Sequence, residues 1–260
     1  MKLYNIFICI FLLFINILSF SETSIPEIKY KKITINDLAD INKWKNSDEL
    51  YTFSNINIDL RELSTNTKKT TFIDILLPAI KVVNSEIRNN SKIAKNLSKK
   101  ENLTPEEKKY AEFLFNKYRV EYGDWEKLDS HLIIYPTSLI LTQGAIESGW
   151  GTSRFFRMGN NLFGMWSNDP NEPRMAAKQT RDNGFTPHLK KYDNIKESVE
   201  DFVLNLSRNN AYKNLRKLVN EDCPPHVIAT GLINYSEEKD LYVKKVINTM
   251  KYNNFTKYDK

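Results

Sequence analysis

The sequence contains little cysteine and little histidine, and this scarcity argues against several kinds of chemistry. Its 260 residues include two cysteines and three histidines. Cys9 lies in an apolar leader, so removal of the leader would leave Cys223 alone and exclude an internal disulfide. A zinc amidase or zinc peptidase needs several such ligands, which makes both classes unfavourable. Cys223 and His226 could form a nucleophile and base or two metal ligands. The two prolines between them hold the side chains apart, which favours a structural cysteine.

The sequence also lacks internal repeats, low-complexity segments and any motif of a nucleic-acid-binding module. Its net charge is +6, but the lysines are scattered rather than arranged in a stripe, so no nucleic-acid partner is predicted. Positive charge of this size fits attraction to an anionic polymer such as cell-wall glycan, and equally fits solubility alone. Hydrophobic residues make up 41% and aromatic residues 12% of the chain, which is ample for a sizeable core.

Residues 1–21 have the three regions of a secretory signal peptide. The segment begins with Lys2, continues as an apolar run and ends with Ser19 and Ser21, small residues at the spacing that signal peptidase prefers. This pattern predicts cleavage before Glu22 and export to the periplasm or cell envelope. The alternative is an uncleaved anchor, although the apolar run is short for a membrane span.

The rest of the chain divides into a polar part and a helical part. Residues 22–65 show no clear period and are expected to form an N-terminal extension or linker, with a short element at about residues 35–44. Residues 66–258 carry apolar side chains at helical spacing in several segments, which predicts one mostly helical domain. Pro78 interrupts the first segment and should kink or divide its helix. Residues 169–191 are rich in proline, glycine and charge, which predicts an irregular segment or a hairpin.

One apolar segment ends in a carboxyl group. Residues 139–146 are apolar or small apart from two polar residues, and this is typical of a buried central helix. Glu147 follows, and Gly149 and Gly151 should end the helix so that the carboxyl group faces a cleft. Poor solvation between an apolar helix and the Trp150 indole would raise its pKa, as a general acid requires. The alternative is a solvated glutamate at a helix end.

Several motifs in order along the chain resemble one known family. They are Lys69-Thr-Thr-Phe-Ile-Asp-Ile-Leu-Leu-Pro-Ala79, Ala145-Ile-Glu-Ser-Gly-Trp-Gly-Thr-Ser153, Gly159-Asn-Asn-Leu-Phe-Gly-Met-Trp166, Tyr192-Asp-Asn-Ile-Lys-Glu-Ser-Val-Glu-Asp201 and Tyr235-Ser236. These motifs resemble the Bax-type branch of bacterial N-acetylglucosaminidases, peptidoglycan hydrolases related to the flagellar-rod enzymes. The resemblance implies an α+β, mostly α, lysozyme-like domain with a small β-hairpin over the active-site cleft. It also implies hydrolysis of the β-1,4 bond between N-acetylglucosamine and N-acetylmuramic acid, with no metal or organic cofactor.

The same resemblance suggests which residues form the site. Glu147 would be the general acid, and Trp150, Asn161, Phe163 and Tyr235 would shape the sugar site. Asn161 could offer a donor and an acceptor to the acetamido group of a sugar, above a floor formed by Phe163. The alternatives are a turn asparagine, a core phenylalanine and a core tyrosine.

A second catalytic carboxylate is less clearly marked. Related glucosaminidases carry a glutamate in the hairpin, but no glutamate here falls in register. Asp169, Glu172 and Asp182 are the acids available, and each could also be a solvated loop charge. We expect Glu147 to lack a rigid carboxylate partner, which suits an inverting mechanism or attack by the acetamido group of the substrate.

Two other functions remain open at this point. A muramidase or lytic transglycosylase would also use a glutamate–serine pair at a helix end, although the Gly-Leu-Met-Gln stretch usual in transglycosylases has no counterpart here. A non-catalytic glycan-binding envelope protein is the alternative from another class. The sequence indicates neither an oligomeric state nor a regulatory partner.

Overall fold

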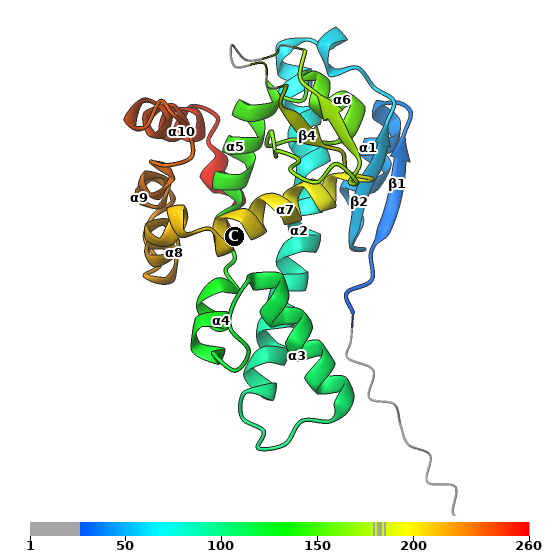
Figure 1. Cartoon of the computed structure of the whole chain (residues 1–260). Helices are drawn as coiled ribbons and strands as arrows, with labels where there is room; N and C mark the ends of the chain where they lie inside the picture. The colour runs from blue at the N-terminus through cyan, green and yellow to red at the C-terminus, as the bar shows by residue number, and fades with distance from the viewer. Residues whose placement is uncertain (1–26, 179, 181–183, 185, 260) are drawn as a thin grey trace, which may run out of the picture.

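The computed structural model describes residues 27–178, 180, 184 and 186–259. The predicted signal peptide and Asp182 lie outside this set. The described chain is mostly helical with two small sheets, as Figure 1 shows. The first half contains β1 (Lys31–Ile35), α1 (Leu38–Lys45), β2 (Tyr51–Ile56), the 3-10 turn η1 (Leu60–Glu62), α2 (Thr65–Leu97), α3 (Pro105–Tyr118) and α4 (Trp125–His131).

The second half of the chain completes the helical body and adds a hairpin. Its elements are α5 (Thr137–Ser148), α6 (Arg154–Gly159), β3 (Arg174–Ala176), β4 (His188–Lys190), α7 (Ile195–Arg208), η2 (Asn210–Tyr212), α8 (Lys213–Asn220), α9 (Pro225–Ile228), η3 (Ala229–Leu232), α10 (Asp240–Tyr252) and η4 (Phe255–Tyr258). No helix among the described residues is long and apolar enough to cross a membrane.

Helix α5 is the buried centre that the sequence predicts. Its side chains from Ser138 to Ala145 are buried. It packs on α2, α10 and η4. Gly144 allows the closest approach, because a Cβ there would lie 2.9 Å from a methyl group of Leu76 on α2. The apolar surface that it buries is the main stabilising contribution of this element.

Helix α2 runs the length of the molecule and joins two hydrophobic cores (Figure 1). Of the two outcomes predicted for Pro78, a kink or a division, the division is wrong, since one helix continues from Thr65 to Leu97. Proline removes one backbone donor, and burial of the flanking residues Leu76, Ala79 and Ile80 in the main core offsets that loss.

The described part of residues 22–65 is an extension that packs on the helical body rather than a linker. Strands β1 and β2 form a parallel pair and are connected by α1. Strand β2 packs on α2 and α7. Ile35, Phe53 and Leu60 are fully buried in the main core. The sequence gives only a weak signal here because each strand has five or six residues and the partner strand lies about twenty residues away.

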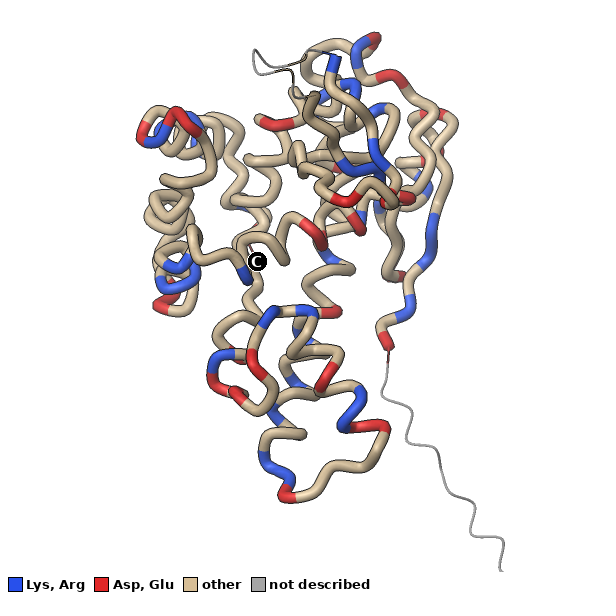
Figure 2. The backbone as a smooth tube through the Cα atoms, viewed as in Figure 1, with Lys and Arg blue, Asp and Glu red and all other residues tan. Residues whose placement is uncertain are grey.

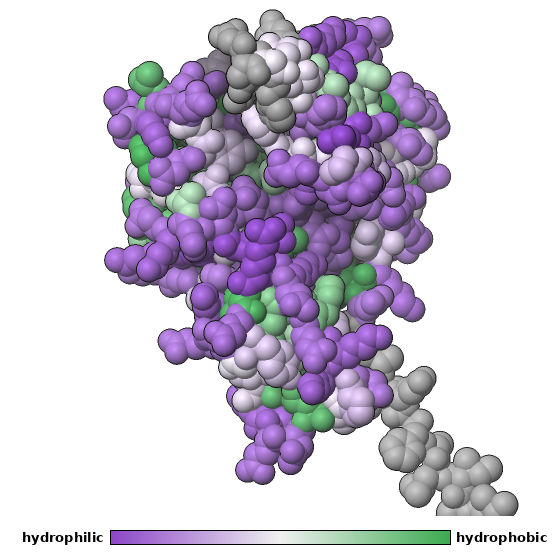
Figure 3. Space-filling view, viewed as in Figure 1, coloured by the Kyte–Doolittle hydropathy of each residue, from purple (hydrophilic) through white to green (hydrophobic). Residues whose placement is uncertain are grey.

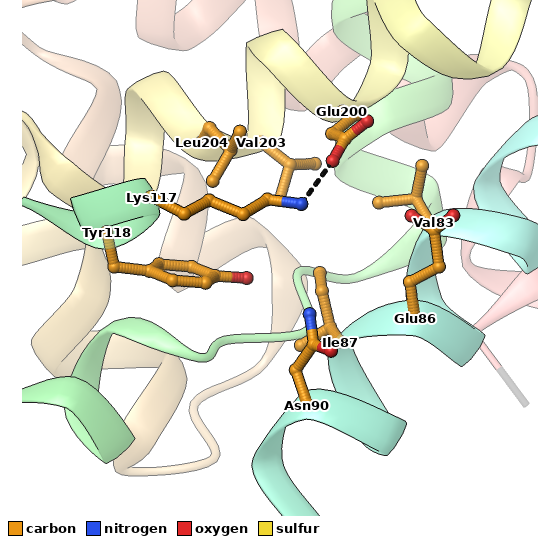
Figure 4. Close-up of a pocket in the computed structure, with 9 residues that line it drawn as sticks. All are labelled: Val83, Glu86, Ile87, Asn90, Lys117, Tyr118, Glu200, Val203 and Leu204. Atoms are coloured by element: carbon orange, nitrogen blue, oxygen red, sulfur yellow. Dashed lines mark hydrogen bonds and ion pairs between the residues drawn. The ribbon is translucent and has the colours of Figure 1, made fainter. Parts of the chain in front are cut away.

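A second, smaller core lies in residues 98–132, here called the α3–α4 lobe. Leu114, Phe115 and Tyr118 of α3 pack with Leu128 of α4 and with the end of α2. The lobe is joined to the main body by a partly buried ion network (Figure 4).

The network contains two lysines and two glutamates from three helices. Lys196 Nζ lies 2.8 Å from Glu86 Oε2 and 2.7 Å from Glu200 Oε2, and Lys117 Nζ lies 2.5 Å from Glu200 Oε1. Burial alone would raise the pKa of Glu200, but the charges of Lys117 and Lys196 hold it below its ordinary value. Because α2, α3 and α7 each contribute, the network fixes the lobe against the body.

The predicted hairpin is present. Strands β3 and β4 pair antiparallel with Met175 opposite Leu189, and Trp166 bridges to the same Leu189. The predicted class, α+β and mostly α with a small hairpin, is confirmed.

Candidate active site

Glu147 lies on the last turn of α5, where the chain makes an unusual turn. Gly149, Trp150 and Gly151 all have positive φ, of 58°, 60° and 78°. Ser148 fixes this turn, since its Oγ donates to the Gly144 carbonyl at 2.6 Å and accepts from the Gly151 N–H at 2.9 Å. A tryptophan in this conformation costs on the order of 1–3 kcal/mol, so the contacts around the turn hold the backbone in place. Glu147 therefore projects from a rigid frame.

The Glu147 carboxyl group is half-buried and receives one strong hydrogen bond. Tyr242 Oη on α10 donates to Glu147 Oε1 at 2.7 Å, and Gln143 Nε2 donates to Tyr242 Oη at 3.1 Å. Gln143 stands one turn before Glu147 and so shares its face of α5. The hydrogen-bonded row Gln143–Tyr242–Glu147 holds the carboxyl group in one orientation.

Burial sets the proton affinity of this group. Burial raises the pKa of Glu147 above its ordinary value, the Tyr242 hydrogen bond and Lys245 oppose this rise, and Glu238 adds to it. The net direction is upward. A carboxyl group with a raised pKa keeps its proton nearer neutrality, which is the property of a general acid.

Two of the predicted sugar-site residues lie next to this group. The Tyr235 ring stacks on the Tyr242 ring at 5.2 Å and 16°, and Tyr235 Oη donates to the Phe163 carbonyl at 3.2 Å. The Phe163 ring is itself stacked on Phe202 at 4.0 Å. The chain from Phe163 through Tyr235 to Tyr242 and Glu147 is therefore continuous.

Trp150 packs in another direction from the one expected. Its indole contacts Phe72 and Phe255 at ring distances of 5.7 and 5.9 Å, and Lys69 Nζ lies 4.7 Å from its centre. Tyr242, rather than the Trp150 indole, is the aromatic residue that contacts the Glu147 carboxyl group. Trp150 thus fastens the turn after α5 to α2 and η4.

Asn161 was expected to contact the sugar, but its side chain is buried and hydrogen-bonded within the protein. The side chain is 1% exposed, its Nδ2 donates to the carbonyls of Met165 and Lys190, and its Oδ1 accepts from the Met165 N–H. Each distance is 2.9 or 3.0 Å. Both Nδ2 hydrogens and one lone pair of Oδ1 are used within the protein, so in this structure Asn161 ties its loop to β4.

The candidate second carboxylates separate into two groups. Asp169 and Glu172 precede β3 and line a cleft with Lys190 and Asp201, and neither is among the charges that act on the Glu147 pKa. Asp182 lies outside the described residues. The described acid whose charge reaches Glu147 is Glu238, just before α10.

Cys223 and His226 show no sign of a reactive pair. Cys223 is a free, partly buried thiol that packs against the main core, whereas His226 is exposed. Across the described part of the chain, no group of three or more histidine, cysteine or acidic side chains could hold a metal ion.

Sequence reasoning missed Gln143 and Tyr242. The signal for Gln143 is a fully buried polar residue four positions before a candidate acid in an otherwise apolar helix. Tyr242 has no comparable signal, because Tyr235 lies in the turns before α10 and only the fold brings α10 against α5.

Comparisons with known proteins agree on one family. Residues 122–255 match the glucosaminidase family model, described as mannosyl-glycoprotein endo-beta-N-acetylglucosaminidase. A curated relative, Protein bax of Escherichia coli strain K12, is 32% identical over 168 residues, which cover 61% of this chain and 58% of that protein.

Two solved structures are also similar. The catalytic domain of the autolysin Auto from Listeria monocytogenes has a TM-score of 0.43 at 21% identity, covering 76% of this chain and 90% of that one. The glycoside hydrolase domain of Salmonella typhimurium FlgJ has a TM-score of 0.37 at 24% identity, covering 56% and 87%.

Proposed function

Because this chain belongs to the glucosaminidase family and is a glycoside hydrolase, we propose that it cleaves peptidoglycan at the β-1,4 bond that follows N-acetylglucosamine. The observation that carries the proposal is the half-buried Glu147, with its raised pKa and its hydrogen bond from Tyr242. The family match covers this residue and Tyr242 together.

Glu147 acts as the general acid in the proposed mechanism. Since Tyr242 donates to Oε1, the proton of the neutral carboxyl group is carried on Oε2, which is the oxygen available to the substrate. Transfer of this proton to the glycosidic oxygen releases the leaving sugar as positive charge develops at the anomeric carbon. Water then adds to that carbon and loses a proton, and Glu147 regains one.

Two routes are proposed for the second part of the reaction, in which either a carboxylate activates the attacking water or the acetamido group of the substrate attacks the anomeric carbon. A retaining pair needs carboxyl groups about 5 Å apart and an inverting pair roughly 6.5–9.5 Å. Asp169, Glu172 and Asp182 are the proposed candidates, and Glu238 joins them because its charge acts on Glu147.

Single alanine substitutions at these four positions test the assignment, with the anomer of the product read by NMR. If one substitution is as damaging as loss of the Glu147 proton and the product is inverted, that residue is the base. If none matters and configuration is retained, the acetamido group is the nucleophile. A covalent sugar ester on any of the four would overturn both routes.

We also propose that the enzyme acts outside the cytoplasm, in the periplasm or cell envelope. The proposal is based on the signal-peptide pattern of residues 1–21 and on the proposed wall substrate. Amino-terminal sequencing of the exported protein should begin near Glu22. Recovery of an intact Met1 terminus in the membrane fraction would contradict export with cleavage.

The bond is tested by mass spectrometry of digested peptidoglycan after borohydride reduction. The proposal expects products that end in reduced N-acetylglucosamine. Reduced N-acetylmuramic acid would instead identify a muramidase, and 1,6-anhydromuramic acid a lytic transglycosylase. Binding of the wall without any digestion would identify a non-catalytic glycan-binding protein.

A further inference from the structure

A charged cleft separates the hairpin from the α3–α4 lobe, and its basic residues have no role in the mechanism above. The interlobe cleft has a volume of about 840 Å³ and is lined by the segment before β3, by the second half of α7 and by the lobe. Figures 2 and 3 show basic residues and a hydrophilic surface where the end of α7 meets the lobe.

Two of the three acids in the cleft, Glu172 and Asp201, are paired within it. Asp201 accepts from Lys190 Nζ at 2.9 Å and from Tyr192 Oη at 2.8 Å, and Glu172 lies 3.8 Å from the same Lys190. Arg208 Nη2 lies 3.6 Å from Asp201 Oδ1, which is a longer contact than the one that Lys190 makes. Four basic residues of the lining, Arg119, Lys127, Lys190 and Arg208, face three acids, Asp169, Glu172 and Asp201, which leaves the cleft with a formal charge of +1.

Some of the basic residues that face these acids have no acidic partner in the described part of the chain. Among the described residues, no carboxylate lies within ion-pair distance of Arg119 or Lys127. Burial and then the neighbouring charge of Arg119 lower the pKa of Arg208, so the two guanidinium groups repel each other across the cleft. Arg208 is held in place by its hydrogen bond to the Lys117 carbonyl at 3.3 Å. Arg208 is thus held in place and Arg119 is exposed after the end of α3, and an anion bound between two like charges would stabilise both.

One short segment of the chain connects the cleft to the surroundings of Glu147. Met165 and Trp166 line it, and Phe163, two residues earlier, binds Tyr235 beside Glu147 through its carbonyl. The Trp166 indole is 44% exposed and forms an apolar surface at the edge of the cleft. The segment from Phe163 to Trp166 therefore connects the surroundings of Glu147 to the edge of the cleft.

We propose that the interlobe cleft binds a carboxylate of the peptide stem carried by N-acetylmuramic acid, with Arg119 and Arg208 as its ligands. This inference rests on the proposed function, because it takes peptidoglycan as the substrate. Guanidinium groups bind carboxylates in a planar, two-point geometry, which a stem presents and an uncharged sugar does not. Arg119 lies outside the residues matched by the family model, so the site extends beyond the part of the chain that the match covers.

The lobe that carries Arg119 and Lys127 is rigid enough to form such a site. The ion network of Lys117, Lys196, Glu86 and Glu200 fixes α3 against α2 and α7, and Figure 4 shows its Lys117–Glu200 pair. Because the backbone of α3 is fixed against α7, the Cα positions of Arg119 and Arg208 keep a set separation, which favours one ligand geometry over a diffuse attraction to any polyanion.

Binding is measured by calorimetry in the Glu147→Gln background, so that no turnover is needed. The probes are soluble glycan fragments with intact peptide stems and the same fragments after an amidase has removed the stems. Arg119→Asn removes the charge and keeps the backbone, because asparagine tolerates the φ of 54° found there. Lys108→Asn removes one exposed charge from the same helix and serves as the matched control.

Stem-bearing fragments should bind about tenfold more tightly than stripped ones, as expected for hydrogen bonds to a charged group. Arg119→Asn should abolish this preference and leave the affinity for stripped fragments unchanged, whereas Lys108→Asn should alter neither. Equal affinity for both fragments, or equal weakening of both by Arg119→Asn, would overturn the inference. Stronger competition by a wall phosphodiester polymer would also overturn it, in favour of a phosphate ligand.

These outcomes are independent of which bond is cut. A stem preference that depends on Arg119 in a protein whose wild type digests no peptidoglycan would sustain the cleft site and refute the proposed hydrolysis. Normal digestion with no stem preference would do the reverse.

Discussion

At the scale of single residues, the chemistry of the site depends on how Glu147 is solvated. Its carboxyl group comes from the end of an apolar helix, and its one strong partner in the structure is a neutral phenol rather than a basic side chain. A cation at that position would lower the pKa and remove the proton that a general acid must hold. Tyr242 orients the group and still leaves the net shift upward.

Replacement of Tyr242 by phenylalanine tests this role. Because the Tyr242 hydrogen bond lowers the pKa of Glu147, its loss should raise that pKa further. The acid form then persists to higher pH, so the alkaline limb of the kcat/KM profile should move upward while kcat falls by about tenfold. Tyr252→Phe on the same helix, where the ring is 84% exposed, is the control. An unchanged pH profile would show that Tyr242 does not act on the acid.

Stability follows from the same shift. A glutamate whose pKa is raised by folding contributes stability at acid pH, and this contribution is lost as pH rises through the folded-state value. Glu147→Gln should therefore unfold at a higher temperature than wild type at neutral pH. The difference should shrink below the ordinary glutamate pKa.

At the scale of elements, a buried amide helps to hold the hairpin to the body. Asn161 makes two hydrogen bonds to Met165 within its own loop and one to the Lys190 carbonyl of β4, although its position in the sequence suggested a sugar contact. Local sequence predicts a turn here, but it does not reveal that β4, almost thirty residues later, supplies one of the acceptors.

Asn161→Ala distinguishes the two roles. Loss of three buried hydrogen bonds at about 1 kcal/mol each should lower the free energy of unfolding by about 3 kcal/mol, measured by denaturant titration. Asn171→Ala, at an exposed position in the segment before β3, should change stability little. A variant of normal stability with only a raised KM would restore Asn161 to the sugar site.

At the scale of the whole molecule, the sequence predicts the helices better than their arrangement. The apolar run of residues 139–146 predicts α5, and the glycines after Glu147 predict where it ends. The ordered motifs predict the family. The pairing of β1 with β2 depends on contacts with α2 and α7 that no local pattern contains. Tyr242, the interlobe cleft and the pairing of Arg119 with Arg208 likewise arise only when distant helices meet.

The central claim is that Glu147 donates the proton, and the turnover of Glu147→Gln on purified peptidoglycan tests it most directly. Glutamine keeps the shape and the hydrogen bond from Tyr242 but cannot donate a proton to the leaving oxygen. We expect kcat to fall by about two to four powers of ten with fold and glycan binding retained, while the isosteric control Glu112→Gln, at an exposed position on α3, keeps full activity. Near-normal turnover of Glu147→Gln would contradict the account.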